Sequence, residues 1–374
     1  MKKRFGVAAF AMAAGCAVIF AGCTGCNGCG ANGKSNEAAF SSNWYADTNY
    51  RYIQPTFTEG KDNFAKEEIT YTVEHDTESA SNTSYSVKYA DSTYKTTFYA
   101  TTLPKHLINE EYSSTYPEND ITVYYYKTEL DIPSITFKVG EDTKTFTDKY
   151  VLTESYFMDV NNHLRPLYSA QKINMASPAE YQVNSIGQSY LLIDQDVFTY
   201  YKYDGSAAKT EIVVRDYEGT PNVTTSVTGL GDTDNSLIDV NGLNIAVRAM
   251  QLSASMSQVI SVYSPSGKMQ NYTFAGSSIA LNAEERKSYE GILAGKQLYK
   301  GGDDSSLNTV CVTATLNASN DMTGVSQKYW FAAIDNAKNN TGRATMVKMS
   351  VPLAFNLGTV NYSLNEIKST LYNN

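Results

Sequence analysis

Three closely spaced cysteines are the residues of this sequence whose spacing most resembles a chemical site. Cys23, Cys26 and Cys29 form a C-x-x-C-x-x-C pattern within a Gly/Asn-rich stretch. Thiolates at such spacing bind zinc or iron–sulfur clusters, but a tetrahedral site needs four ligands. The only cysteine further along the chain is Cys311, which we expect to be a small buried residue. We therefore predict no metal and no cofactor, and regard Cys26 and Cys29 as bystanders or an occasional local disulfide.

The three histidines do not form a recognisable site either. His75, His106 and His163 lie far apart, and no pair has the spacing of metal ligands or of an H-E-x-x-H motif. The G-x-S-x-G turn of many serine hydrolases is absent from the sequence. Acidic residues are plentiful, so a pair of catalytic carboxylates could be present, but nothing singles one pair out. We predict that the protein is not an enzyme.

An acidic stretch at 229–236, Gly-Leu-Gly-Asp-Thr-Asp-Asn-Ser, has two interpretations. Its first acidic positions match the start of a calcium-binding loop. The sixth position, however, is Leu237 rather than glycine, and the twelfth is Leu243 rather than glutamate. Capping of a following helix by Asp234 or Ser236 needs no ligand, and we favour that interpretation.

Tyrosines are the remaining candidates for binding. Twenty-nine are present, and they are dense on single predicted strands, as at Tyr124, Tyr125, Tyr126 and Tyr200. Side chains alternate along a strand, so Tyr124 and Tyr126 share one face and Tyr125 lies on the other. Exposed tyrosines can stack on sugars, which makes Tyr124, Tyr126 and Tyr200 candidate ligand-binding residues. The alternative is that these rings cover the sheet surface and pair across strands.

The N-terminus has the composition of an export signal. A basic head, Met1-Lys2-Lys3-Arg4, precedes an uncharged run of apolar and small residues from 5 to 22. A basic head followed by such a run is typical of a secretory signal peptide. An uncleaved transmembrane helix is the alternative, but the run is at the lower limit of a span and rich in Ala and Gly. We predict removal of residues 1–22.

The end of this leader, Phe20-Ala21-Gly22-Cys23, resembles the lipobox of bacterial lipoprotein signal peptides. The resemblance implies cleavage before Cys23 and a diacylglycerol thioether on its sulfur. The membrane is then a partner through the lipid on Cys23. The expected location is the cell envelope, at the outer face of the cytoplasmic membrane or at the outer membrane.

Charge excludes some partners of the mature chain. Removal of residues 1–22 takes three of the 30 basic residues and none of the 39 acidic ones, which leaves 27 against 39 and a net charge of −12. Nucleic acid and anionic membrane surfaces both require a basic face, so we predict neither as a partner. With 42% apolar and 18% charged residues, the chain is expected to fold.

The predicted organisation has three parts: the leader at 1–22, a flexible lipid-anchored tether at 23–43, and a single β-rich extracytoplasmic domain at 44–374. Residues 68–74 are typical of the domain, because apolar and polar side chains alternate as in a half-buried strand. Strands in succession with one or two helices predict a mainly β (α+β) fold, in which helices lie against a curved antiparallel, half-barrel-like sheet.

Local signals predict several individual elements. Segments 84–90 and 92–100 suggest a hairpin with its turn near Asp91, and segments 134–139 and 143–146 suggest another across Gly140-Glu141-Asp142. Helices are predicted from two further signals. Asn282 and Glu285 form a capping box, and Ser363 with Glu366 could cap a final short helix.

Three stretches, at 67–73, 234–249 and 330–364, resemble the opening strand, central helix and closing strands of a family of uncharacterised extracytoplasmic bacterial proteins. That family is similar in fold to the lipoprotein carriers of the bacterial envelope. The resemblance implies an unclosed, curved half-barrel with a helix across its open, apolar face. It offers no catalytic residues, and this chain has apparent insertions near 90–135 and 275–305.

Two functions follow as expectations. The first is a non-catalytic binding or carrier protein that buries an apolar ligand, such as a lipid, on the concave face of the sheet. The alternative is a surface module that binds glycan or protein through exposed tyrosines. A concave face filled by the protein's own side chains would count against the first, and an aromatic patch on the convex face would favour the second.

Overall fold

The computed structural model describes the greater part of the chain after residue 65. The described residues are 11–13, 16–18, 66–81, 85–104, 107, 122–160, 163–178, 190–203, 206–216, 218–230, 237–250, 252–295, 307–317, 326–332, 334–335, 340–341, 344–353 and 357–370. Cys23, Cys26, Cys29, His106, Asp234 and Ser236 lie outside them. Among the described helices, none is long and apolar enough to span a membrane.

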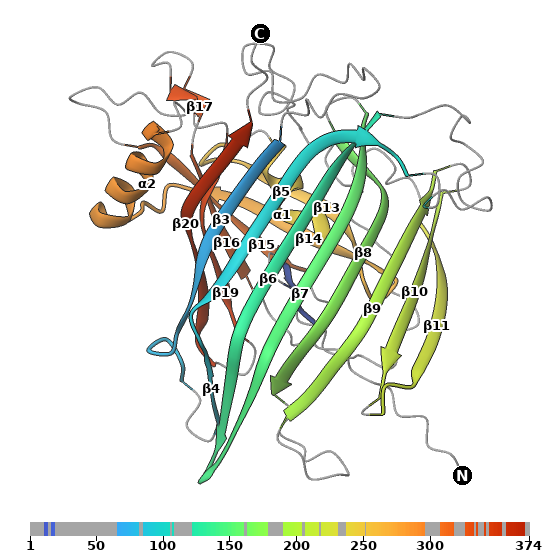
Figure 1. The fold of residues 1–374 in the computed structure, drawn as a ribbon. Coiled ribbons are helices and arrows are strands. Elements are labelled where there is room, and N and C mark those ends of the chain that lie inside the picture. The colour runs from blue at the N-terminus through green and yellow to red at the C-terminus, as the bar shows by residue number, and fades with distance from the viewer. Residues whose placement is uncertain are drawn as a thin grey trace.

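One large sheet organises the molecule (Figure 1). Its strand order is β11-β10-β9-β8-β7-β6-β5-β3-β20-β19-β16-β15-β14-β13-β12, and β4 also pairs with β6. Neighbouring strands are antiparallel except β12 and β13. The strands are β3 (Lys66–Asp76), β4 (Tyr85–Tyr89), β5 (Ser92–Thr102), β6 (Thr122–Val139), β7 (Asp142–Val160), β8 (His163–Pro178), β9 (Tyr190–Lys202), β10 (Ala207–Arg215), β11 (Pro221–Gly229), β12 (Ile238–Asp239), β13 (Ser257–Ser264), β14 (Lys268–Ser277), β15 (Thr309–Leu316), β16 (Ser326–Ala332), β19 (Met346–Pro352) and β20 (Thr359–Thr370).

The sheet is strongly curved, so that β13–β16 lie behind β5–β8 in Figure 1. This arrangement confirms the predicted fold class: a mainly β protein built on a curved antiparallel sheet with two short helices. Contacts also link the two ends of the sheet. The hydroxyl of Thr228 on β11 donates to the carbonyl of Gly267, 2.6 Å away in the turn between β13 and β14.

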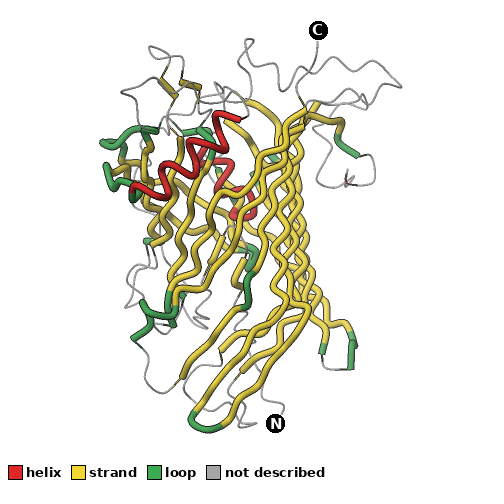
Figure 2. Tube along the Cα trace, turned by 60° about the vertical axis from the view of Figure 1, so that its left-hand side comes forward, coloured by secondary structure: helices red, strands yellow, loops and turns green. Residues whose placement is uncertain are grey.

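A short helical segment lies inside the curve of the sheet. It consists of β12, the 3₁₀ helix η4 (Val240–Gly242) and α1 (Leu243–Arg248), and Figure 2 shows α1 enclosed by strands. Every residue from 237 to 250 is buried. The helix predicted here is therefore present but starts later than expected. Asp239 is the residue that caps η4, because its side chain accepts a hydrogen bond from the backbone N–H of Asn241.

The second helix confirms a local prediction. α2 (Ala283–Gly295) lies outside the sheet, next to β20 (Figure 1). Asn282 N–H donates to Glu285 Oε2 at 3.1 Å, and Glu285 N–H donates to Asn282 Oδ1 at 2.8 Å, so the capping box is complete. Lys348 Nζ on β19 lies 2.5 Å from Glu285 Oε1 and ties the helix to the sheet.

Two predicted elements are wrong. Segments 84–90 and 92–100 do not form a hairpin with each other, because β6 has 18 residues and pairs with β5 along its first half and with β4 along its second. The final short helix is also absent. β20 runs as a strand from Thr359 to Thr370, with a bulge between Leu364 and Glu366. Pairing along β3 outweighs the local capping signal there.

Other predicted strand features are confirmed. β6 and β7 form the hairpin expected across residues 140–142, and Gly140 takes the left-handed conformation (φ +61°) that glycine allows at such a turn. Tyr329, Trp330, Phe331 and Ala332 of β16 are all buried, so both faces of that part of the strand are covered. Within the predicted leader, β1 (Ala11–Ala13) and β2 (Cys16–Val18) form a separate antiparallel pair. Two further short strands, β17 (Ile334–Asp335) and β18 (Asn340–Thr341), also pair with each other.

Candidate functional site

Segment 237–250, hereafter the inner segment, presents a polar face to the sheet. Asp239, Asn241, Asn244 and Arg248 are 2–6% exposed, and each contacts side chains of the surrounding strands. A helix packed on a sheet usually buries an apolar stripe. Burying polar groups this deeply destabilises the folded protein unless the groups are hydrogen-bonded.

Asp239 is the most buried charged group of the inner segment. Its Oδ2 accepts hydrogen bonds from the hydroxyls of Ser169, at 2.7 Å, and of Tyr201, and its Oδ1 accepts one from Asn241 N–H at 2.7 Å. Burial raises the pKa of Asp239, and these three hydrogen bonds oppose that shift. Burial likewise raises the pKa of Tyr201, so its hydroxyl stays protonated and donates.

The asparagines join the inner segment to the front strands. Asn244 Nδ2 donates to the hydroxyl of Tyr94 at 3.1 Å, while the hydroxyl of Tyr126 donates to Asn244 Oδ1 at 2.6 Å. Gln171 Nε2 donates to Asn241 Oδ1 at 3.1 Å. These contacts fix the rotation of the helix, because both polar ends of the Asn244 amide have a partner.

Arg248 ends the polar face with a buried ion pair. Its two terminal nitrogens lie 2.5 and 3.0 Å from the two carboxylate oxygens of Glu67 on β3. Arg248 is 5% exposed and Glu67 is 7% exposed. A two-point contact of this kind matches the planar guanidinium to the carboxylate and is the stronger form of such a pair.

The rest of the inner segment is packed tightly by apolar side chains. Gly242 lies against the ring of Phe157, and a Cβ at that position would be 2.4 Å from Phe157 Cζ. Ile245 packs in one cluster with Phe98, Tyr124 and Phe157. The concave face at these strands is therefore filled by the protein's own side chains.

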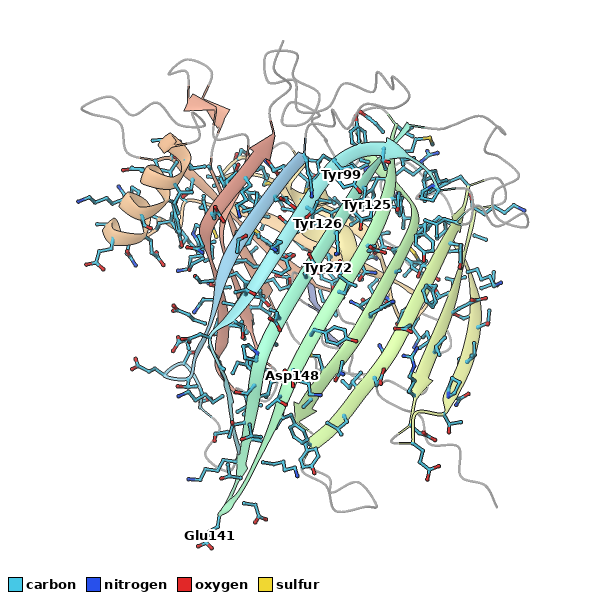
Figure 3. All side chains as sticks on the ribbon, in the orientation of Figure 1. Tyr99, Tyr125, Tyr126, Glu141, Asp148 and Tyr272 are labelled. Atoms are coloured by element: carbon cyan, nitrogen blue, oxygen red, sulfur yellow. The ribbon has the colours of Figure 1, made fainter. Side chains whose placement is uncertain are left out.

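The structure separates the three tyrosines predicted to bind a ligand. Tyr124 and Tyr126 face the inner segment and are 8% and 2% exposed, so a ligand at the surface does not reach them in this conformation. Tyr125 points to the opposite, convex face, as strand alternation predicted; Figure 3 labels Tyr125 and Tyr126 on β6. Tyr200 also lies on the convex face.

Five tyrosines form a continuous row across the convex face, which we call the tyrosine row. The strand register places Tyr99, Tyr125, Tyr156, Tyr168 and Tyr200 opposite one another on five neighbouring strands, β5 to β9. Successive ring centroids are 4.9, 5.0, 6.2 and 5.3 Å apart, and the rings are tilted against each other by 50–59°. Sequence reasoning missed Tyr99, Tyr156 and Tyr168, because only the register brings them together.

The tyrosine row differs in exposure along its length. Tyr125 and Tyr168 are each 7% exposed, whereas Tyr99, Tyr156 and Tyr200 are half-buried. The hydroxyl of Tyr125 donates to Glu154 Oε1 at 2.7 Å. Burial raises the pKa of Tyr156 to about 12 and also raises that of Tyr125. The hydroxyls of the row are therefore protonated at neutral pH and can donate hydrogen bonds.

Two lysine–glutamate ion pairs lie near the tyrosine row. Lys127 Nζ lies 2.8 Å from Glu129 Oε1, and Lys209 Nζ lies 3.1 Å from Glu211 Oε1. Lys127 and Lys209 come from the two strands β6 and β10. With Glu154, these groups give two positive and three negative charges along this part of the face, which disfavours a polyanion as the ligand.

The histidines and Cys311, which could serve as metal ligands, do not gather into a site in the part of the chain that the structure describes. There, no three His, Cys, Asp or Glu side chains are grouped closely enough to hold a metal ion. His75 Nε2 lies 2.8 Å from the carbonyl oxygen of Leu357, and His163 is 3% exposed. Cys311 is a free, buried cysteine, as expected.

Together these features describe a β-rich, barrel-like protein with a polar helical segment in its interior and an aromatic row on its outer face. Neither a family model nor a curated protein sequence matches this chain. Among solved structures, it is similar to a crystal structure described as a β-barrel-like protein of domain of unknown function DUF1849 from Brucella abortus. The identity is 7%, the alignment covers 82% of this chain and 98% of that one, and the TM-score is 0.38.

Proposed function

We propose that this protein is a non-catalytic, lipid-anchored binding protein of the cell envelope that holds an extended glycan along the tyrosine row. The observation that carries the proposal is the alignment of five tyrosines, one on each of five neighbouring strands. Such a row gives a ligand repeated aromatic contacts along a straight path.

The spacing of the tyrosine row supports a ligand made of repeated rings. Strands of a sheet are about 4.8 Å apart, a distance comparable to the length of one sugar ring in an extended chain. Each tyrosine combines an apolar ring with a hydroxyl donor, and a sugar combines apolar C–H faces with hydroxyls. The half-buried Tyr99, Tyr156 and Tyr200 offer the accessible contacts.

The predicted anchor supports the same function. A lipid on Cys23 holds the domain at a membrane surface, and the tether at 23–43 reaches on the order of 25 Å if it behaves as a flexible chain. A domain kept that close to the membrane meets the glycans of the envelope at high local concentration.

The test compares tyrosines of the row with a tyrosine outside it. We expect the triple variant Tyr99→Ala, Tyr156→Ala and Tyr200→Ala to bind glycan at least about tenfold more weakly, since an aromatic contact contributes about 0.5–1.5 kcal/mol. Full-length protein in detergent is measured against purified cell-wall glycan and soluble oligosaccharides by calorimetry. Tyr150→Ala is the matched control, because Tyr150 is 43% exposed but lies outside the row.

Two results would contradict the glycan proposal. One is the absence of any measurable glycan binding by the wild-type protein. The other is equal loss of affinity in the triple variant and in Tyr150→Ala, with the melting temperature of each variant recorded to exclude unfolding.

A second candidate function is the carriage of an apolar ligand on the concave face. It is favoured by the polar face of the inner segment, because water can satisfy Asp239, Asn241 and Asn244 if the segment moves outward. The complete burial of the inner segment weighs against it, since opening would expose a large apolar area.

Native mass spectrometry of the full-length protein tests the carrier function. We expect a carrier to retain a lipid through detergent exchange and to release it on unfolding, after which solvent extraction identifies it. Cys23→Ser, expressed in parallel, separates a bound lipid from the covalent lipid of the anchor. If neither the wild-type nor the Cys23→Ser sample carries a non-covalent lipid, the carrier function is contradicted.

A further inference from the structure

Strand β11 is an edge strand of the large sheet, and the turn between β13 and β14 contacts its inner side at Thr228. Among the described strands it pairs only with β10, and it ends the strand order (Figure 1). Its nine residues, Pro-Asn-Val-Thr-Thr-Ser-Val-Thr-Gly, contain no charged side chain, and its register with β10 is free of bulges. Edge strands usually carry lysines or bulges that prevent pairing with another chain. Here only Pro221, at the first position, has that effect.

The hydrogen bonds at the two ends of the β10–β11 pair show which backbone groups of β11 point away from β10. Asp216 N–H donates to the carbonyl of Thr220 at one end, and Leu230 N–H donates to the carbonyl of Ser206 at the other. In an antiparallel pair, hydrogen-bonded positions alternate. Even-numbered residues of β11 therefore bond to β10, while the N–H and C=O groups of Val223, Thr225 and Val227 point to the open edge.

The side chains at these positions are exposed. Val223 is 58% exposed and Val227 is 62% exposed, and both are among the most exposed large apolar residues of the described chain. Thr225 between them is exposed as well. The open edge thus combines unpaired backbone groups with two apolar side chains on one face.

The sequence of β11 is nearly symmetric about Thr225. Val223 and Val227 are identical and equally distant from it, and Thr224 and Ser226 both carry a hydroxyl. A strand of this kind can pair with a copy of itself in antiparallel orientation, because each side chain then meets a similar one across the two-fold axis.

We propose that β11 pairs with β11 of a second copy of this chain, antiparallel and centred on Thr225, so that the sheet continues from one molecule into the other. Val223 of each copy then lies opposite Val227 of the other, and the two Thr225 residues face each other. The outward backbone groups gain partners, and the four valines form two cross-strand pairs, one on each side of Thr225.

The proposed dimer is expected to be weak in solution. Pairing of one nine-residue edge buries less surface than the roughly 1,200–2,000 Å² of a standard stable interface. The proposed lipid anchor confines the copies to one membrane surface, which raises their effective concentration. The dimer itself depends only on the edge strand, so it stands apart from the glycan proposal.

Sedimentation equilibrium of the full-length protein in density-matched detergent tests the proposal. We expect the wild type to form dimers as its concentration rises and Thr225→Pro to remain monomeric with an unchanged melting temperature, because the lost N–H does not bond to β10. Thr225→Ser keeps the N–H and is the matched control, which should dimerise like the wild type.

A charge exchange tests the register. Val223→Lys with Val227→Lys places lysines opposite each other across the two-fold axis and should abolish the dimer, whereas Val223→Lys with Val227→Glu places opposite charges together and should restore it. A wild type that stays monomeric at every concentration would overturn the proposal. A dimer that survives both the proline and the double-lysine variants, or that the lysine–glutamate variant does not restore, would overturn it equally.

Discussion

Arg248→Met is expected to lower the free energy of unfolding by about 3–5 kcal/mol. The substitution removes the guanidinium that contacts both oxygens of Glu67 and leaves that carboxylate in a buried position. A buried charge without its counter-charge is far more costly than the pair itself. Urea unfolding of the full-length protein, followed by circular dichroism, measures the loss.

The double variant Glu67→Met with Arg248→Met is the control for this prediction. It removes both charges and keeps most of the volume, so we expect it to recover most of the lost stability. Arg248→Lys keeps the charge but not the two-point contact, and should fall between them. A loss of less than about 1 kcal/mol in the Arg248→Met variant would show that water reaches Glu67.

Acidification from pH 7 to pH 4 is expected to destabilise the protein through His163 by about 3 kcal/mol. Burial lowers the pKa of His163 from 6.5 to about 4, and each pKa unit corresponds to about 1.4 kcal/mol. Between these values the unfolded chain binds a proton that the folded protein does not. Stability is therefore complete above pH 6.5 and is lost as the pH falls toward 4.

Two variants isolate this pH dependence. His163→Gln should flatten the dependence of unfolding free energy on pH between 4 and 6.5. Burial also lowers the pKa of His75, which acts in the same direction, so part of the slope remains. Burial instead raises the pKa of Asp239, which favours the folded state at low pH, and Asp239→Asn should make the protein more sensitive to acid. Equal slopes in the wild type and His163→Gln would contradict the assignment.

Binding on the concave face and binding on the outer surfaces place different demands on this fold. The inner segment fills the concave face, and its polar contacts with Ser169, Tyr201 and Tyr126 fix its position. In the described part of the chain, Tyr99, Tyr156 and Tyr200 on the convex face and Val223 and Val227 on β11 are accessible without any rearrangement. Binding on those outer surfaces therefore requires less change of structure than binding inside.

Much of the local structure could be predicted from the sequence, because its signals act between near neighbours. Alternation along β6 correctly placed Tyr125 on the face opposite Tyr124 and Tyr126. The capping box of α2 depends on Asn282 and Glu285, three residues apart. The turn at Gly140 depends on one glycine between two strand patterns.

Where local signals allowed two outcomes, long-range pairing decided. Segments 84–90 and 92–100 each look like a hairpin strand, but the 18-residue β6 accommodates both in series, and nothing near Asp91 encodes its length. The capping signal at Ser363 and Glu366 is overruled by the pairing of β20 with β3, almost 300 residues away.

The candidate sites depend on the tertiary structure most of all. The sequence by itself determined that tyrosines alternate on β6, and it predicted export with lipidation at Cys23. Only the fold decided which face is the interior, because Tyr126 is covered by Asn244 from 118 residues along the chain. The tyrosine row exists because the register of five strands aligns residues from 99 to 200. Strand register arises from the packing of the whole sheet, so no local pattern encodes it.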